Sequence, residues 1–127
     1  MNDVARVLVV DPVAAVRRHV AELLERGGCS VWVCRDLAEA LGMLAGESFG
    51  VVITELVLPD AQGPEVVARL KAVAPAAHVI ACTALARRDL VVAARLAGAA
   101  DFLAKPVQAE RLVGSVRERL ARPGVGG

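Results

Sequence analysis

The chain has 127 residues, with 15 basic and 14 acidic side chains and a formal net charge of +1. Apolar residues make up 56% and charged residues 23%, which favours one folded domain over a disordered chain. No basic field and no clustered Lys/Arg run is available to attract nucleic acid or a membrane surface, and no apolar stretch is long enough to cross a bilayer. We therefore expect neither direct nucleic-acid binding nor membrane binding.

The three cysteines, Cys29, Cys34 and Cys82, are odd in number and lack the spacing of metal ligands. We expect them to be small buried hydrophobic residues in a reducing cytoplasm, and we expect no zinc site. The first apolar segment contains Arg6 and Asp11, which the central region of a signal peptide would not tolerate. Cytoplasmic localisation is therefore the prediction.

Short apolar runs alternate along the chain with segments of helical periodicity. The first run, Arg6–Val10, is continuous and rich in β-branched residues, as expected of a strand buried on both faces. Apolar residues then recur every three or four positions until Gly27 ends the predicted helix. A second strand, Ser30–Cys34, precedes a helix that begins with Asp36 as its cap and Glu39 at its third position.

The second half of the chain repeats this order. The third strand, Val51–Thr54, leads through a loop to a helix with Pro64 as its first residue. The fourth strand, Val79–Thr83, precedes a less clearly patterned helix over about 88–96. The fifth strand, Asp101–Ala104, precedes a last helix whose apolar positions are Leu112, Val113, Val116 and Leu120.

Five strand–helix units in alternation predict a parallel sheet with helices on both faces, in which a site forms beyond the carboxyl ends of the strands. The residues at those ends are Asp11, Glu55, Thr83 and Lys105. Taken singly, an acid after a strand is often a turn residue, and a Thr is simply a good strand former. Taken together, two carboxylates, a hydroxyl and an ammonium are predicted to converge at one edge of the sheet.

Four stretches of sequence carry a resemblance to a known family. They read Val-Leu-Val-Val-Asp11, Ile-Thr-Glu55-Leu-Val-Leu-Pro59-Asp-Ala-Gln-Gly63, Ile-Ala-Cys-Thr83-Ala84 and Gly98-Ala-Ala-Asp-Phe102-Leu-Ala-Lys105-Pro106. In this order and at this spacing they resemble the receiver domains of bacterial two-component response regulators. The resemblance implies a doubly wound, flavodoxin-like α/β fold of three layers, with strand order 2-1-3-4-5 and a cis Lys105–Pro106 bond. We expect the receiver domain to span residues 1–121 and a flexible Gly/Pro tail to span 122–127, as the cut linker to an output domain.

The resemblance also implies roles for the site residues. In receivers, an Asp after the third strand accepts a phosphoryl group from a histidine kinase, and two acids after the first strand help to bind Mg²⁺. A Thr or Ser hydroxyl and a Lys contact the phosphoryl oxygens. Asp11, Thr83 and Lys105 match these positions in the sequence. Two residues depart from the pattern: Glu55 replaces the accepting Asp, and Pro12 replaces the second acid.

The two departures predict a pocket that is chemically disabled. Glu55 carries its carboxylate one methylene further from the backbone, and misplacement by about an ångström can cost roughly a hundredfold in rate. Mg²⁺ demands near-ideal octahedral oxygen geometry, so Asp11 and Glu55 are expected to hold it weakly at most when Pro12 supplies no carboxylate. We predict a pseudo-receiver that is not an enzyme, that needs no cofactor, and in which Glu55 pairs with Lys105.

The same residues are compatible with two alternatives. The domain could be a working receiver that accepts phosphate on Glu55 from a histidine kinase with a sparse Mg²⁺ site. Glu55 could also be an engineered mimic of the charged state, although one such change would not explain Pro12. A nucleotide- or flavin-binding domain is set aside, because no Gly-rich phosphate loop follows the first strand.

The expected output surface consists of the fourth helix, the fifth strand and the fifth helix, through which the family signals. We predict that a protein partner, or a second copy of the chain, docks there, and that Thr83 and the aromatic Phe102 form the switch behind it. The arginines of this surface are expected to form a solvated face: Arg87, Arg88, Arg95, Arg111 and Arg117. Receivers of winged-helix transcription factors place a Glu and an Arg early in the last helix to pair across a dimer. This chain has Arg111 and Ser115 at those positions, which argues against that dimer.

Overall fold

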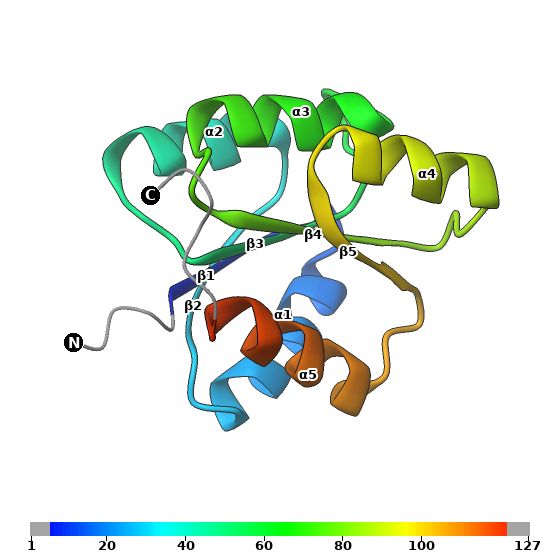
Figure 1. Cartoon of the computed structure of the whole chain (residues 1–127). Coiled ribbons are helices and arrows are strands. Elements are labelled where there is room, and N and C mark those ends of the chain that lie inside the picture. Colours follow the sequence, from blue (N-terminus) through cyan, green and yellow to red (C-terminus); the bar gives the residue numbers. More distant parts are fainter. Residues whose placement is uncertain (1–5, 122–127) are drawn as a thin grey trace.

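The computed structural model describes residues 6–121, which form one central sheet between two layers of helices (Figure 1). The strands of this part of the chain are β1 (Arg6–Val10), β2 (Ser30–Cys34), β3 (Val51–Thr54), β4 (His78–Thr83) and β5 (Ala99–Ala104). The helices are α1 (Ala14–Arg26), α2 (Leu37–Gly46), α3 (Pro64–Val73), α4 (Arg88–Leu96) and α5 (Ala109–Leu120). No helix in this range is long and apolar enough to span a membrane.

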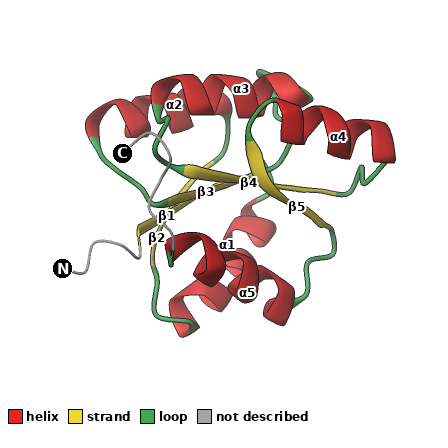
Figure 2. Ribbon diagram, viewed as in Figure 1, coloured by secondary structure: helices red, strands yellow, loops and turns green. Residues whose placement is uncertain are grey.

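All neighbouring strands pair in parallel, in the order β2-β1-β3-β4-β5, which confirms the predicted doubly wound topology. Helices α2, α3 and α4 cover one face of the sheet, and α1 and α5 cover the other (Figure 2). Because the strands are parallel, their carboxyl ends meet at one common edge. The predicted tail over 122–127 lies outside the described residues.

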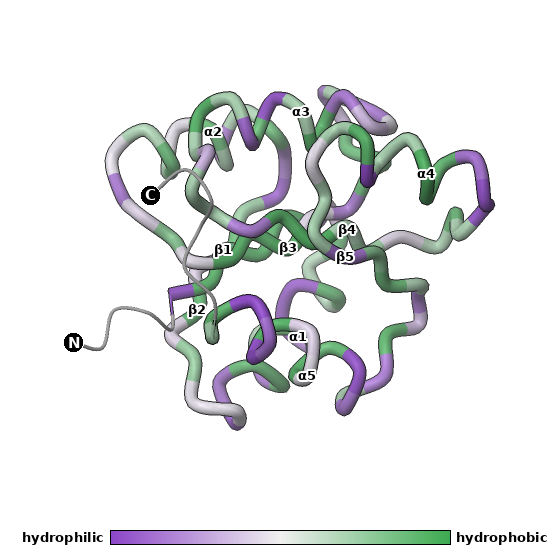
Figure 3. Tube along the Cα trace, viewed as in Figure 1, coloured by the Kyte–Doolittle hydropathy of each residue, from purple (hydrophilic) through white to green (hydrophobic). Residues whose placement is uncertain are grey.

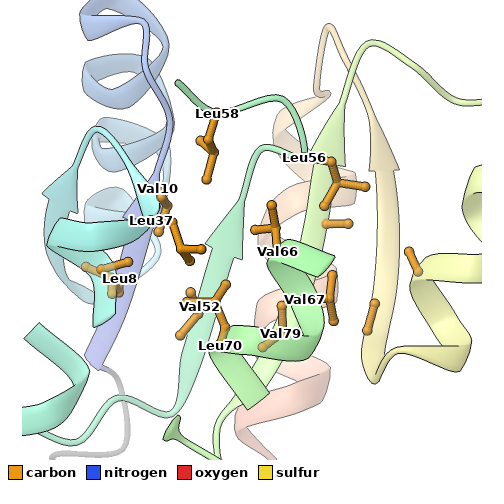
Figure 4. Close-up of a cluster of buried hydrophobic side chains, with 14 of the residues drawn as sticks. Leu8, Val10, Leu37, Val52, Leu56, Leu58, Val66, Val67, Leu70 and Val79 are labelled. Atoms are coloured by element: carbon orange, nitrogen blue, oxygen red, sulfur yellow. The ribbon is translucent and has the colours of Figure 1, made fainter. Parts of the chain in front are cut away.

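Each face of the sheet has its own hydrophobic core, because successive strand residues point to opposite faces. In β1, Leu8 and Val10 belong to the core between the sheet and α2, α3 and α4, whereas Val7 and Val9 belong to the core between the sheet and α1 and α5. Figure 4 shows the first of these cores, in which Val52 and Val79 of the sheet lie under the α3 residues. The hydropathy trace in Figure 3 shows the same pattern, with hydrophobic strands between helices of mixed character.

Two expectations about local structure need correction. Strand β4 begins at His78 and β5 at Ala99, earlier than predicted, because both starts pair with neighbours in the sheet even though they are weak strand formers. Cys34 and Cys82 are buried, but Cys29 is only half-buried, since it lies in the turn between α1 and β2 rather than inside the sheet. Helix α2, in contrast, begins as predicted, with the Asp36 carboxylate accepting a hydrogen bond from the backbone N–H of Glu39 at 2.9 Å.

Candidate functional site

Backbone hydrogen bonds place three of the four predicted site residues at the same level of the sheet. The N–H of Asp11 donates to Cys34 O at 3.1 Å, and the N–H of Glu55 donates to Val10 O at 2.9 Å. The N–H of Lys105 donates to Thr83 O at 3.0 Å. Each residue thus continues the ladder one position past its strand. Their side chains meet beyond the carboxyl edge of β1, β3 and β5, as the alternation of elements requires.

The Lys105 ammonium lies between the two carboxylates of this pocket. Its Nζ donates to Asp11 Oδ2 at 2.6 Å and to Glu55 Oε1 at 2.7 Å. The side chains of Asp11, Glu55 and Lys105 are 5%, 9% and 19% exposed, so water screens these ion pairs poorly. The ion pair hypothesised between Glu55 and Lys105 is therefore present, and Asp11 shares it.

The second oxygen of each carboxylate is also in use. Asp11 Oδ1 accepts a hydrogen bond from the N–H of Val13 at 2.9 Å. Glu55 Oε2 accepts two, from the N–H of Leu56 at 2.6 Å and from the N–H of Val57 at 3.1 Å. All four oxygens of these two carboxylates are thus bound by donors of the protein itself, which holds both side chains in one arrangement.

The hydrogen bonds decide the charge state of the pocket. Burial acts to raise the pKa of Glu55, but hydrogen bonds from Lys105, Thr83 and the N–H of Leu56 outweigh it and hold the pKa below the usual range. Burial acts to lower the pKa of Lys105, yet its hydrogen bonds to Asp11 and Glu55 prevail and raise that pKa. Glu55 is therefore a carboxylate and Lys105 an ammonium at neutral pH.

This set of groups does not suit the magnesium ion that the family resemblance implies. Mg²⁺ needs oxygen donors in a near-octahedral shell, and here an ammonium group occupies the space between the carboxylates of Asp11 and Glu55. Pro12, which stands where receivers have a further metal-binding acid, is exposed and offers no side-chain oxygen. Among residues 6–121, no group of three or more His, Cys, Asp or Glu side chains is arranged to hold a metal. We derive no chemistry through a metal at this site.

The remaining predicted residues lie around the pocket. Thr83 is buried at the end of β4, and its hydroxyl oxygen accepts a hydrogen bond from the N–H of Leu85 at 3.3 Å. The Lys105–Pro106 peptide bond is cis. Phe102 is 9% exposed and belongs to the core covered by α2, α3 and α4, so its ring is buried in this structure.

One group of buried polar residues was not predicted from the sequence. Asp101 is buried in β5, and its carboxylate accepts from both terminal nitrogens of Arg111, at 3.0 and 3.1 Å, and from Ser115 Oγ at 2.6 Å. Burial acts to raise the pKa of Asp101, but the hydrogen bonds from Arg111 and Ser115 lower it to about 2. Arg95 Nη2 lies 3.8 Å from the same carboxylate.

Arg111 is exposed, as expected for a solvated arginine face, but its guanidinium also binds Asp101 and so ties α5 to β5, which the sequence analysis did not predict. The two residues that replace a dimer pair of winged-helix receivers instead bind a carboxylate of their own chain. An acid inside an otherwise apolar strand was the available signal, because a buried carboxylate requires donors. Arg111 and Ser115, one turn apart on the next helix, could then have been proposed as those donors.

The chain belongs to the response regulator receiver domain family, whose model matches residues 7–117. It is 28% identical over 116 residues to the chemotaxis protein CheY of Bacillus subtilis, covering 91% of this chain and 97% of CheY. It is 35% identical over 120 residues to the response regulator MprA of Mycobacterium avium, covering 92% of this chain and 51% of MprA. The chain therefore spans nearly all of one relative and about half of the other.

The fold agrees with solved structures of the family. The crystal structure of a CheY-like receiver domain protein from Methanospirillum hungatei superimposes with a TM-score of 0.86 at 28% identity, covering 91% of this chain and 93% of that one. The predicted flavodoxin-like fold and the resemblance to receiver domains are both confirmed. Receiver domains act in two-component signalling, in which they interact with partner proteins, and some of them form dimers.

Proposed function

We propose that this receiver domain is a phosphorylation-independent docking module. The observation that carries the proposal is the Lys105 ammonium, which bridges Asp11 and Glu55 at 2.6 and 2.7 Å. This internal ion-pair network holds the pocket in one state without a phosphoryl group. The net contribution of a buried ion pair to stability is often small, but loss of one partner leaves an uncompensated buried charge and destabilises the fold. The network therefore fixes the geometry of the pocket.

The same contacts oppose phosphoryl transfer. An attacking carboxylate oxygen must point in line with the phosphorus, and both oxygens of Glu55 already accept hydrogen bonds from Lys105, Leu56 and Val57. An incoming phosphoryl group would also bring negative charge toward Asp11 and Glu55. With no acid at position 12 to help hold a divalent cation, that repulsion is not neutralised.

The second candidate is a working receiver that transfers phosphate to Glu55 from a histidine kinase. Thr83 and Lys105 favour it, because both stand where working receivers contact the phosphoryl oxygens. The test is incubation with acetyl phosphate and Mg²⁺, followed by intact-mass measurement. We expect no phosphoryl adduct on the wild-type chain. A stable adduct that peptide mapping places on Glu55 would overturn the proposal in favour of this candidate.

The matched control restores both departures at once. The Glu55→Asp/Pro12→Asp double variant should gain Mg²⁺ binding, measured by titration calorimetry, and should then accept phosphate from acetyl phosphate. A double variant that folds but does not bind Mg²⁺ would show that our explanation of the disabled pocket is wrong.

The docking surface that we propose is formed by α4, β5 and α5. On and just before α4, three apolar side chains are exposed to different degrees: Leu85 at 47%, Val92 at 51% and Leu96 at 84%. Arg87, Arg88 and Arg95 are exposed beside them. We infer a cytoplasmic protein partner with an apolar patch bordered by acidic residues, and a non-enzymatic role for the domain. Substitution of Leu96 by Ser should weaken capture of such a partner and leave the pocket intact.

A further inference from the structure

An apolar cleft lies beside the Lys105 pocket, on the face of the sheet that α1 and α5 cover. Its volume is about 470 Å³, and it is bounded by the first turns of α1, the end of β4 and the segment that follows β5. Small side chains leave this space open, because Ala15, Cys82 and Ala84 stand where larger residues would fill it. Val20 and Cys82 of the lining are buried, so the cleft is recessed into the chain rather than a flat patch.

The size and lining of this cleft are those of a small-molecule site. Such sites usually measure about 300–1,000 Å³ and combine an apolar lining with few polar groups. Of the lining side chains, only His19 and Lys105 carry nitrogen. The large hydrophobic side chains that stand exposed on the described part of the chain all lie outside the cleft. Its apolar lining is therefore reached only by insertion, which favours a small molecule over the surface of a protein partner.

The charged groups beside the cleft favour an uncharged ligand. The Lys105 ammonium is not free to bind an anion, because it donates to Asp11 and Glu55 at 2.6 and 2.7 Å. These two carboxylates and one ammonium leave one negative charge in excess, which repels an anionic group. Burial raises the pKa of the Cys82 thiol to about 11, so this part of the lining is neutral at physiological pH.

One polar side chain of the cleft is available to orient a ligand. His19 lies on α1, is exposed, and forms no hydrogen bond or ion pair with another residue of the described range 6–121. A neutral imidazole has one donor and one acceptor nitrogen, so it can bind an N–H, an O–H or a carbonyl group. Lys105 lines the cleft as well as the pocket. A molecule in the cleft would therefore contact the residue that holds Asp11 and Glu55 together.

We propose that this cleft binds an uncharged, largely apolar small molecule that carries one hydrogen-bonding group for His19. The proposal goes beyond the docking function and does not rest on it, because binding in the cleft needs neither a phosphoryl group nor the α4 surface. The apolar lining supplies most of the affinity, and His19 fixes the orientation of the ligand.

The test uses two fluorescent probes that share one ring skeleton and differ in charge. N-phenylnaphthylamine is uncharged and its amine can donate to His19, whereas anilinonaphthalene sulfonate adds an anionic group to the same rings. Both fluoresce more strongly in apolar surroundings, so the protein is titrated into a fixed low concentration of each probe. We expect saturable binding of the uncharged probe with a Kd of roughly 10–200 μM, in keeping with its size.

The anionic probe should bind at least about tenfold more weakly, because its sulfonate approaches the excess negative charge of the pocket. Equal affinity for the two probes would contradict the proposed charge preference. Absence of saturable binding of the uncharged probe at protein concentrations up to about 1 mM would overturn the proposal as a whole.

Matched variants locate the probe. Ala15→Leu should weaken binding of the uncharged probe by at least about tenfold, because the larger side chain occupies the cleft, and the fold should persist because Ala15 is exposed. The same change at the exposed Ala68 of α3, on the other face of the sheet, should have no effect. His19→Ala should weaken binding roughly threefold to tenfold through the lost hydrogen bond. If Leu96→Ser abolishes binding and Ala15→Leu does not, the probe binds on the α4 surface and the proposal is wrong.

Chemical-shift mapping by NMR needs no variant. Addition of the uncharged probe to the isotope-labelled chain should move the amide signals of Val16, His19 and Val107, which lie on two walls of the cleft. Shifts confined to α4 would refute the assignment of the site. A phosphoryl adduct on Glu55 would overturn the proposed docking function and leave these probe measurements unchanged, so the two proposals fail separately.

Discussion

Replacement of Lys105 by Met removes the ammonium from the pocket while it keeps most of the side-chain volume. Asp11 and Glu55, 5% and 9% exposed, would then face each other as buried carboxylates with no cation between them. Breaking a buried ion pair by removal of one partner typically costs about 3–5 kcal/mol. We expect a loss of that size in the free energy of unfolding at pH 7, measured by urea denaturation.

The pH dependence of this loss separates an electrostatic cause from a packing cause. In the wild type, the pKa of Glu55 is held below its ordinary value of about 4.5, so its contribution to stability is present above pH 4.5 and declines as the pH falls further. In the variant, burial still acts to raise the pKa of Glu55 while the Lys105 hydrogen bond that lowers it is gone, so protonation of Glu55 relieves the repulsion in mild acid. The difference between wild type and variant should therefore shrink between pH 7 and pH 4.

Lys71 provides the matched control. Its Nζ donates to Pro75 O at 2.8 Å and to Ala77 O at 2.9 Å, and it pairs with no carboxylate of residues 6–121. Lys71→Met should therefore cost a similar amount at pH 7 and at pH 4. Addition of Glu55→Gln to the Lys105→Met variant should recover part of the loss, because one of the two repelling charges disappears. A Lys105→Met loss below about 1 kcal/mol, or one that does not change with pH, would refute the electrostatic account of the pocket.

Three further substitutions test the fold around the site by thermal and urea denaturation. Asp101→Asn should lower the free energy of unfolding by about 1–3 kcal/mol at pH 7, because it weakens the hydrogen bonds to Arg111. Since the pKa of Asp101 is about 2, this difference from the wild type should shrink as the pH falls from 4 toward 2. Asp36→Ala should cost about 1 kcal/mol through the lost cap of α2. Gly98→Ala should cost more than about 1 kcal/mol, because the φ angle of 118° and a contact of 3.0 Å with Lys71 both oppose a Cβ atom there. A neutral result in any of these would show that the corresponding contact does not persist in solution.

The fold and the pocket could be predicted because both follow from the order of the elements. Parallel strands that end at one edge bring Asp11, Glu55 and Lys105 together whatever their exact rotamers. The continuous apolar run of β1 likewise predicts a strand buried on both faces, whose side chains alternate between the two cores. The starts of β4 and β5 could not be predicted, because Ala99 and His78 are strand residues through pairing with their neighbours rather than through local preference.

The Asp101 network could not be derived from strand ends at all. Whether Arg111 and Ser115 point toward β5 depends on the rotation of α5 about its axis, which packing of Leu112 and Val116 against the sheet sets. The sequence therefore identifies a buried acid that needs donors, and tertiary packing selects which donors reach it. The hydrogen bond from Lys105 to Asp11 also depends on tertiary structure, because the arrangement of the loop after β1 decides whether the two side chains meet.

The two departures from the receiver pattern change different properties of the pocket: Pro12 removes a negative charge, and Glu55 keeps the charge but carries its carboxylate further from the backbone. With Asp11, Glu55 and Lys105 ionised, the pocket has one negative charge in excess, which nearby N–H groups help to stabilise. A second acid in place of Pro12 would double that excess and require a further cation, whereas without it one ammonium suffices. Glu55→Asp alone adds no negative charge, and Pro12→Asp alone adds one but leaves the longer Glu55 carboxylate bound to Lys105, so each single variant should fail to restore Mg²⁺ binding. Only the double variant changes both the charge and the reach of the carboxylate.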